Sequence, residues 1–136
     1  MAIERTFAMI KPNAVSNKHV GEIIDAIEKA GFEIVEMKRM KFSLDLSKEF
    51  YDIHSSKPFF GGLTSYIASG PVVAMVLEKE DAVLAWRNLM GATNPKDAEE
   101  GTIRKRFGVD IDDNATHGSD ATETAKIESE LIFNGC

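Results

Sequence analysis

The stretch Val72–Leu77 reads VVAMVL, six apolar residues in a row without a charge. Side chains of a strand alternate between the two faces of a sheet, so an unbroken apolar run predicts a strand that is buried on both faces. Ile3–Lys11 contains a similar run, FAMI at positions 7–10, and Pro12 is expected to end that strand. Two strands of this kind predict the interior of a sheet that is covered on both sides.

The other elements alternate around these two strands. Apolar residues recur with helical spacing over Val20–Ala30, and Gly31 suits the left-handed position that ends such a helix. Phe32–Phe42 alternates apolar with charged residues, which is typical of a strand with one wet face. Further helices are expected at Leu46–His54, Pro58–Ser69, Asp81–Met90 and Ala121–Phe133.

A long irregular segment, Gly91–Ser119, lies before the last helix. It has one short helical stretch, Thr102–Phe107, and room for a weak fourth strand. Irregular segments longer than about 12–15 residues are uncommon in compact domains and are often functional. The whole pattern predicts an α/β fold, an α+β sandwich of ferredoxin-like type. That fold has βαββαβ order, an antiparallel four-stranded sheet with helices packed on it, and here a long irregular loop segment.

Length and composition restrict the function classes. With 136 residues the chain fits one domain, which we assign to residues 1–136. Its 16 basic and 22 acidic residues give a net charge of −6, which disfavours nucleic acid and anionic membranes as partners. Cys136 is the single cysteine, so no intrachain disulfide is expected, which fits a reducing compartment. Gly, Pro, Ser and Thr interrupt the uncharged stretch Pro58–Leu77, so we expect no membrane span. Glu4 and Arg5 and an apolar run of only four residues near the N-terminus predict no secretory leader, so we expect a cytoplasmic protein.

His117 is the first candidate for chemistry, because it lies in NATHGSD just before the last predicted helix. Asp120 or Ser119 is expected to cap that helix, which places His117 near the positive end of a helix dipole. Such a position favours an uncharged, nucleophilic imidazole and stabilises a nearby anion. An ordinary loop histidine remains an alternative interpretation.

Glu128 is the second candidate, because it falls in the middle of the apolar face of the last helix. An unpaired buried carboxylate is unfavourable, so Glu128 is expected to have a partner. A histidine N–H suits this role, since a carboxylate behind an imidazole fixes its tautomer. A lysine or arginine partner, or a place at the edge of the core, is the alternative.

Three cations and one aromatic pair complete the candidates. Lys11, Arg87 and Arg104 are candidates for binding a polyphosphate in an otherwise acidic chain, with surface ion pairs as the alternative. Phe59 and Phe60 are adjacent and cannot share a helix face, so we expect one in the core and the other free to stack on a base.

Six motifs carry a family resemblance. They are TFAMIKPNAV (6–15), FYDIH with KPFFGGL (50–63), SGPVVAMVLE (69–78), GATNP (91–95), GTIR (101–104) and NATHGSD (114–120). They follow one another in the same order over about Glu4 to Phe133, and the histidine-centred motif is the most specific. The chain therefore resembles the nucleoside diphosphate kinases, in particular bacterial-type members with a short C-terminus.

The resemblance implies a ping-pong phosphoryl transfer with broad base specificity. His117 is expected to take the γ-phosphoryl group of a nucleoside triphosphate on Nδ1 and pass it to a nucleoside diphosphate, while Glu128 holds the other ring nitrogen. The family pattern assigns contacts with phosphates, ribose or the histidine to Lys11, Tyr51, Arg87, Thr93, Arg104 and Asn114.

The same resemblance implies how the base and the cofactor are bound. Phe59 would stack on one side of the base and Ile111 on the other, with Leu63 nearby; stacking tolerates every base. Mg²⁺ would lie on the β- and γ-phosphates, with Asp120 reaching it only through water and no direct protein ligand. A homo-oligomer built from dimers, either a tetramer or a hexamer, is also implied.

The departures from the family pattern are few. Ala121 replaces a common serine, Asn13-Ala14 replaces Asp-Gly, and the short C-terminus leaves the assembly undecided. A catalytically silent nucleotide-binding protein on the same fold is the alternative function, although a supported nucleophile argues against it. A ferredoxin-like RNA binder is disfavoured by the net charge and by the lack of an RRM aromatic signature.

Overall fold

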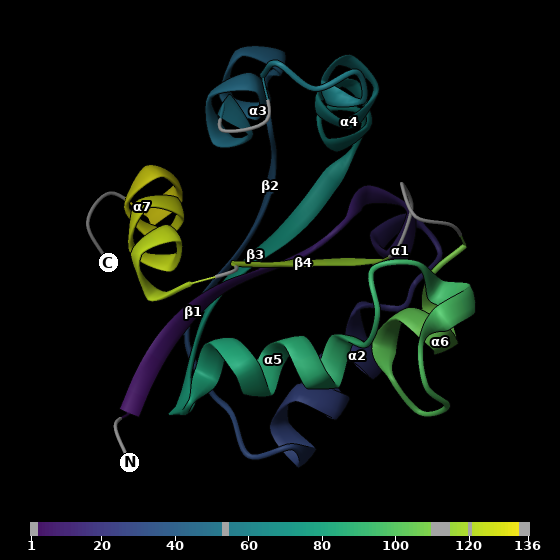
Figure 1. Ribbon diagram of the computed structural model, residues 1–136, viewed down its shortest axis with the longest axis vertical. Coiled ribbons are helices and arrows are strands. Elements are labelled where there is room, and N and C mark those ends of the chain that lie inside the picture. Colours follow the sequence, from purple (N-terminus) through teal and green to yellow (C-terminus); the bar gives the residue numbers. More distant parts are fainter. Residues whose placement is uncertain (1–2, 53–54, 110–114, 120, 134–136) are drawn as a thin grey trace.

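The computed structural model describes residues 3–52, 55–109, 115–119 and 121–133, and the statements below concern those residues. One sheet runs through the molecule with helices on both of its faces (Figure 1). Its elements in chain order are β1 (Ile3–Ile10), α1 (Pro12–Ser16), α2 (Val20–Lys29), β2 (Glu33–Lys41), α3 (Leu44–Phe50), α4 (Phe60–Ile67), β3 (Pro71–Glu80), α5 (Ala82–Met90), the 3₁₀ helix η2 (Pro95–Asp97), α6 (Ile103–Phe107), β4 (Thr116–Gly118) and α7 (Thr122–Phe133).

The sheet has four strands in the order β2-β3-β1-β4, and each neighbouring pair is antiparallel. The two long inner strands, β1 and β3, are the two apolar runs of the sequence. The short strand β4 pairs only with β1, with Met9 opposite His117. This order confirms the predicted ferredoxin-like α+β sandwich.

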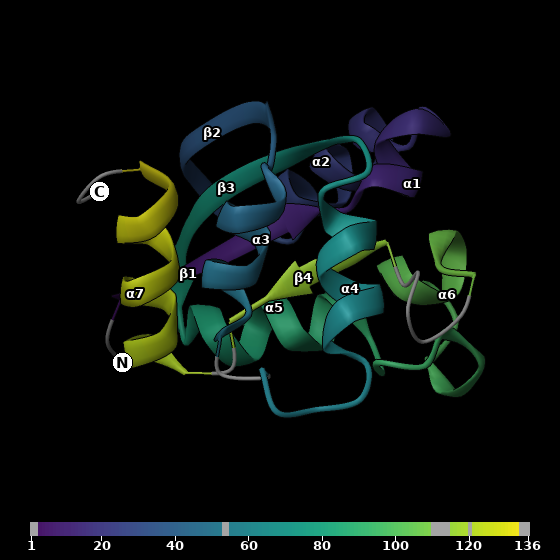
Figure 2. The same ribbon diagram turned by 90° about the horizontal axis from the view of Figure 1, so that it is seen from above.

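Alternating residues of the inner strands divide the core into two layers. Ala8 and Ile10 of β1 pack with α2 and α5 on one face, while Phe7 and Met9 pack with α3, α4 and α7 on the other. Figure 1 shows these two groups of helices on opposite sides of the sheet, and in Figure 2, seen from above, α3 and α4 lie in front of it. All four side chains are fully buried, which confirms the two-sided burial that the apolar run predicts.

The expected helices and strands are present, with end points shifted by a few residues. Gly31 adopts a φ of +93° just after α2, as predicted for a left-handed helix end. Helices α1 and η2 were not predicted, and both place a proline in their first turn, where its missing N–H costs nothing. The weak fourth strand lies at Thr116–Gly118 and holds His117. No helix in the described ranges is long and apolar enough to cross a membrane.

Candidate active site

His117 occupies the middle of β4 and points into the layer formed by α3 and α7. Its ring lies edge-on to Phe50 at 5.2 Å and to Tyr51 at 5.7 Å between ring centroids, and Phe7 of β1 is 6.2 Å away. These aromatic rings cover most of the imidazole, whose side chain is 18% exposed. The strand therefore presents a histidine in a largely apolar surrounding.

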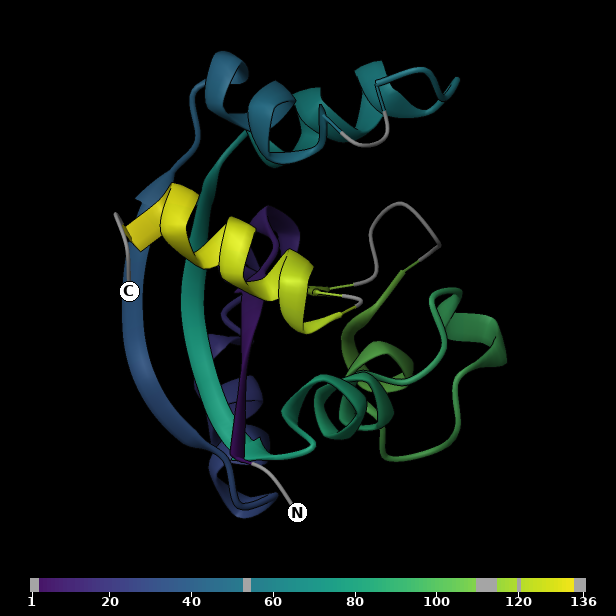
Figure 3. The same ribbon diagram turned by 60° about the vertical axis from the view of Figure 1, so that its left-hand side comes forward.

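Glu128 approaches His117 from the neighbouring helix α7, which packs against β1. The His117 Nε2 and Glu128 Oε1 atoms are 3.1 Å apart, and the Ser119 hydroxyl donates to the same oxygen at 2.7 Å. Figure 3 shows α7 running down to the end of β4, which brings the two segments together. The carboxylate is buried, so the predicted histidine partner is confirmed and a lysine or arginine is not needed to explain its burial.

The contact with Glu128 fixes the chemical form of the imidazole. A carboxylate only accepts hydrogen bonds, so Nε2 must carry a proton to bond with it. In the neutral ring the other nitrogen, Nδ1, then holds the free lone pair. The arrangement supplies a nucleophilic nitrogen on one side of the ring and charge stabilisation on the other.

Tyr51 places a neutral hydroxyl beside the histidine. Burial raises the pKa of Tyr51 above its ordinary value of 10.0, and the nearby charges of Glu128 and Tyr66 raise it further. Its hydroxyl is buried and has no hydrogen-bond partner among the described residues. An unsatisfied buried donor is unfavourable, so this hydroxyl is a candidate to donate to a group other than the described residues.

Two arginines, Arg104 of α6 and Arg87 of α5, interact electrostatically near β4. The buried Arg104 donates to the carbonyls of Gly91 at 3.1 Å and Thr116 at 3.0 Å, which ties α6 to β4 beside His117. Burial, and to a smaller extent the nearby charge of Arg87, lowers the pKa of Arg104 to about 10. Like charges that interact in this way repel one another, and an anion between them relieves the repulsion, which is the property of a phosphate site.

Lys11 follows β1 and shares a face with His117. Phe7 and Met9 lie on that face, and the backbone of Lys11 stays extended, so its side chain continues the same alternation. The Lys11 amide also donates to the Ala115 carbonyl at 2.8 Å, which aligns the end of β1 with the start of β4. The lysine is buried, which is unusual for this residue type.

The aromatic pair divides as predicted. Phe60 packs against the core, whereas Phe59 remains 46% exposed at the start of α4. Leu63 lies one helical turn after Phe59 and is partly buried, so the two share a face of α4. Neither residue is in contact with His117 in this structure.

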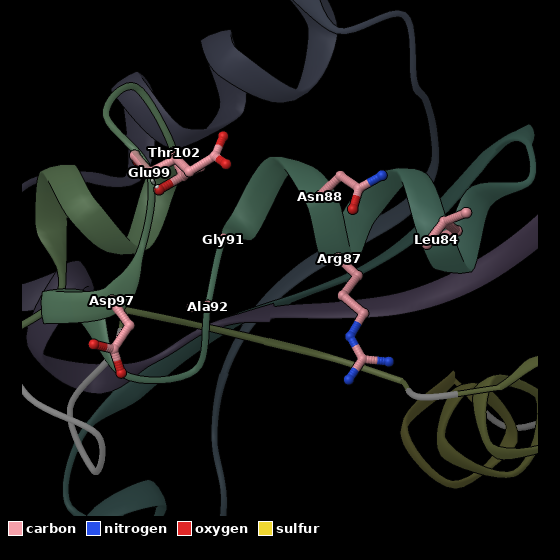
Figure 4. Close-up of a pocket in the computed structure, with 8 residues that line it drawn as sticks. All are labelled: Leu84, Arg87, Asn88, Gly91, Ala92, Asp97, Glu99 and Thr102. Atoms are coloured by element: carbon pink, nitrogen blue, oxygen red, sulfur yellow. Dashed lines mark hydrogen bonds between the residues drawn. The ribbon is translucent and has the colours of Figure 1, made fainter.

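Arg87 borders a pocket of about 610 Å³ between α5 and the segment around η2 (Figure 4). Gly91, Ala92, Asp97 and Thr102 also line it, so acidic and basic groups are mixed there. Arg87 and Asp97 extend toward one side of the pocket in Figure 4, away from Glu99 and Thr102. Thr93, next to Ala92, is exposed on the same loop.

Three predicted site residues, Ile111, Asn114 and Asp120, lie outside the described residues, so the helix cap expected at Asp120 is untested. Sequence reasoning treated Ser119 as a cap and missed its bond to Glu128. The period of two along a strand was the available signal, because it places positions 117 and 119 on one face. Sequence reasoning also missed Trp86, whose indole N–H donates to the His117 carbonyl at 3.2 Å. Within the described ranges, no three His, Cys, Asp or Glu side chains are grouped to hold a metal ion.

Comparisons with known proteins place this arrangement among phosphotransferases. The family model described as nucleoside diphosphate kinase matches residues 4–136. Enzymes named nucleoside diphosphate kinase from Desulfovibrio desulfuricans and Citrifermentans bemidjiense are 53% and 51% identical; the matches cover 98% and 97% of this chain and 96% of each relative.

Solved structures agree with the sequence relatives. The nucleoside diphosphate kinase of Aquifex aeolicus aligns with a TM-score of 0.97 at 40% identity, over 98% of this chain and 97% of that one. The Halobacterium salinarum enzyme, solved in complex with CDP, aligns with a TM-score of 0.93 at 44% identity, over 98% and 89%.

Proposed function

Because this chain belongs to the nucleoside diphosphate kinase family, we propose that His117 is the residue that carries the phosphoryl group between nucleotides. The chain is a phosphotransferase that moves the γ-phosphoryl group of a nucleoside triphosphate to a nucleoside diphosphate. The observation that carries the proposal is the chain of contacts from Ser119 to Glu128 to His117 Nε2, which leaves Nδ1 as the nucleophile.

The proposed reaction has two matched steps. The Nδ1 lone pair of His117 forms a bond to the γ-phosphorus, and the bond from that phosphorus to the bridging oxygen breaks, which releases the diphosphate. A terminal oxygen of a second nucleoside diphosphate then forms a bond to the same phosphorus, and the bond to Nδ1 breaks. Glu128 stabilises the positive charge that develops on the ring in both directions.

The surrounding donors suit the phosphates. Tyr51 has a buried neutral hydroxyl without a hydrogen-bond partner among the described residues, and Lys11 shares the face of His117. Both observations support assigning the two residues to the transferred group. Arg87 and Arg104 are assigned to the remaining phosphates, because an anion relieves their mutual repulsion. Thr93 and Asn114 are assigned to phosphate or ribose by the family pattern.

The base is proposed to stack on Phe59, with Leu63 beside it and Ile111 on its other side. Exposure of Phe59 on α4 supports this assignment. Stacking reads the flat face of a base and not its edge, so all common bases are accepted. The bound CDP of the Halobacterium relative supports nucleotides as ligands of this chain too.

Mg²⁺ is the proposed cofactor. The donors at the site are cations and a hydroxyl, which suit phosphate oxygens and not a metal ion, so the ion is assigned to the β- and γ-phosphates. When bound there it neutralises phosphate charge during transfer. Asp120 is assigned a water-mediated contact with it.

The remaining proposals concern the whole molecule. We assign residues 1–136 to one kinase domain that acts in the cytoplasm as a homo-oligomer built from dimers. Support for self-association comes from the edge strand β2, whose backbone edge is open to pairing and whose Met37 is 51% exposed.

The test is the covalent intermediate. Protein mixed with γ-labelled ATP and Mg²⁺ is expected to gain one acid-labile phosphoryl group per chain, which GDP removes. His117→Ala is expected to abolish the phosphoryl adduct. The matched control is His19→Ala, which removes another imidazole, one that packs against Phe107 of α6, and it should leave the adduct intact. An adduct that persists in His117→Ala refutes the nucleophile. An unmodified protein that binds ATP but forms no adduct supports the silent nucleotide-binding alternative.

A further inference from the structure

The buried indole of Trp86 hydrogen-bonds to the main chain of His117 from the α5 side of the sheet. Trp86 lies on α5, is fully buried, and donates its N–H to the His117 carbonyl at 3.2 Å. It stands on the opposite face of the sheet from the imidazole, in the layer that contains α2 and α5. Trp86 therefore contacts the backbone of the residue whose side chain does the chemistry.

β4 is short and lies at the sheet edge, so each contact that holds it affects the position of His117. It has three residues and pairs with β1 alone, at Ala8, Met9 and Ile10. Two more backbone bonds, from Lys11 N–H to Ala115 and from Ser119 N–H to Phe7, extend this pairing, and Arg104 holds the Thr116 carbonyl. The indole bond is the side-chain contact on the His117 backbone itself. A carbonyl oxygen has two lone pairs, so the indole bond adds to the strand pairing without replacing it.

The indole itself has little freedom to move. Its ring meets Phe32 edge-on at 6.2 Å, and it packs directly against Gly118. A Cβ atom at position 118 would lie 2.5 Å from Trp86 Cδ1 and 2.6 Å from Nε1. Glycine at 118 therefore lets the polar edge of the indole reach β4.

We propose that Trp86 is a positioning residue for phosphoryl transfer. Its N–H fixes the position and orientation of the β4 backbone at His117, and this orients His117 Nδ1 toward the phosphorus. The inference rests on the proposed role of His117. Correct aim matters because displacements of about 1 Å at a reacting atom lower rates by up to about a hundredfold. The opposite interpretation is that the bond only satisfies a buried donor.

The test exploits the fact that Trp86 is the single tryptophan of the chain. Growth of a tryptophan auxotroph on benzothienylalanine replaces the N–H of Trp86 by sulfur and keeps the ring shape. Growth on 5-fluorotryptophan keeps the N–H and serves as the matched control. Ile27→Val, a buried change in the same core layer away from β4, controls for packing defects.

The measurements are the single-turnover rate of His117 phosphorylation by ATP with Mg²⁺ and the ADP dissociation constant. Loss of one buried hydrogen bond is expected to slow phosphorylation about five- to tenfold in the benzothienylalanine protein. The ADP dissociation constant should change less than about twofold, since binding does not require the same aim. The fluorotryptophan and Ile27→Val proteins should keep the normal rate.

Equal rates in the benzothienylalanine and fluorotryptophan proteins refute the inference. So does a slow rate that Ile27→Val reproduces, or a matching loss of ADP affinity. If the benzothienylalanine protein fails to fold, Trp86→Phe is measured in the same way and judged by the same outcomes. An unmodified protein that forms no adduct at His117 refutes the proposed function instead, so the two failures are distinguishable.

Discussion

Replacing Glu128 by glutamine tests the electrostatic part of the mechanism. The change removes one negative charge and keeps the size of the side chain and one acceptor oxygen. That oxygen can still accept from Ser119 and from His117 Nε2, so the geometry at 2.7 Å and 3.1 Å is expected to persist. The variant therefore isolates the charge of the carboxylate.

The magnitude follows from the separation and the burial. Two unit charges about 4 Å apart interact by about 4 kcal/mol at an effective dielectric constant of about 20. The side chains of His117 and Glu128 are 18% and 11% exposed, so that dielectric constant suits the pair. If about half of the positive charge has developed in the transition state, the loss is about 2 kcal/mol, or roughly a thirtyfold slower transfer.

The assay is rapid-quench phosphorylation of the protein by labelled ATP, together with ADP affinity measured by calorimetry. Glu128→Gln should slow phosphorylation about thirtyfold and change ADP affinity little, because the lost interaction strengthens only as the ring becomes cationic. Glu130→Gln is the matched control, since it makes the same charge change on the exposed face of α7. Rates within twofold of each other in the two variants refute the role given to Glu128.

Three further outcomes are expected. Gly118→Ala should lower both the unfolding temperature and the phosphorylation rate, because the new methyl group meets Trp86 at 2.5 Å; normal values for both in calorimetry and rapid quench contradict the packing. Arg87→Met should raise the unfolding temperature of the free protein slightly and weaken tripolyphosphate binding at least about fivefold, because Arg87 opposes the charge of Arg104 until an anion binds. Tyr51 has a raised pKa, so its neutral hydroxyl stabilises the fold fully below pH of about 10, and that contribution falls above it as the unfolded chain ionises. The phenolate absorbance of the native protein and of Tyr51→Phe should therefore rise identically with pH until the protein unfolds. A difference between the two titration curves below the unfolding pH would show that Tyr51 ionises in the folded protein and would contradict its burial.

The sequence by itself was sufficient to predict the sheet and to single out Glu128 as a carboxylate that needs a partner. Runs such as VVAMVL can be satisfied only inside a covered sheet, because burial of apolar side chains is the main stabilising term and the strand period assigns each one a face. The same reasoning singled out Glu128, since a carboxylate on an apolar helix face requires a partner. These inferences depend on local spacing, which a sequence contains in full.

Only the tertiary structure decided which groups meet. Glu128 is eleven positions from His117, and a choice between histidine and a cation as its partner depended on how α7 crosses β1. The Tyr51 hydroxyl, which has no partner in the described part of the chain, and the indole of Trp86 beside β4 depend on the same packing of distant segments. Local periodicity fixes the face on which a side chain lies, whereas distances across elements are set by the packing of the whole core.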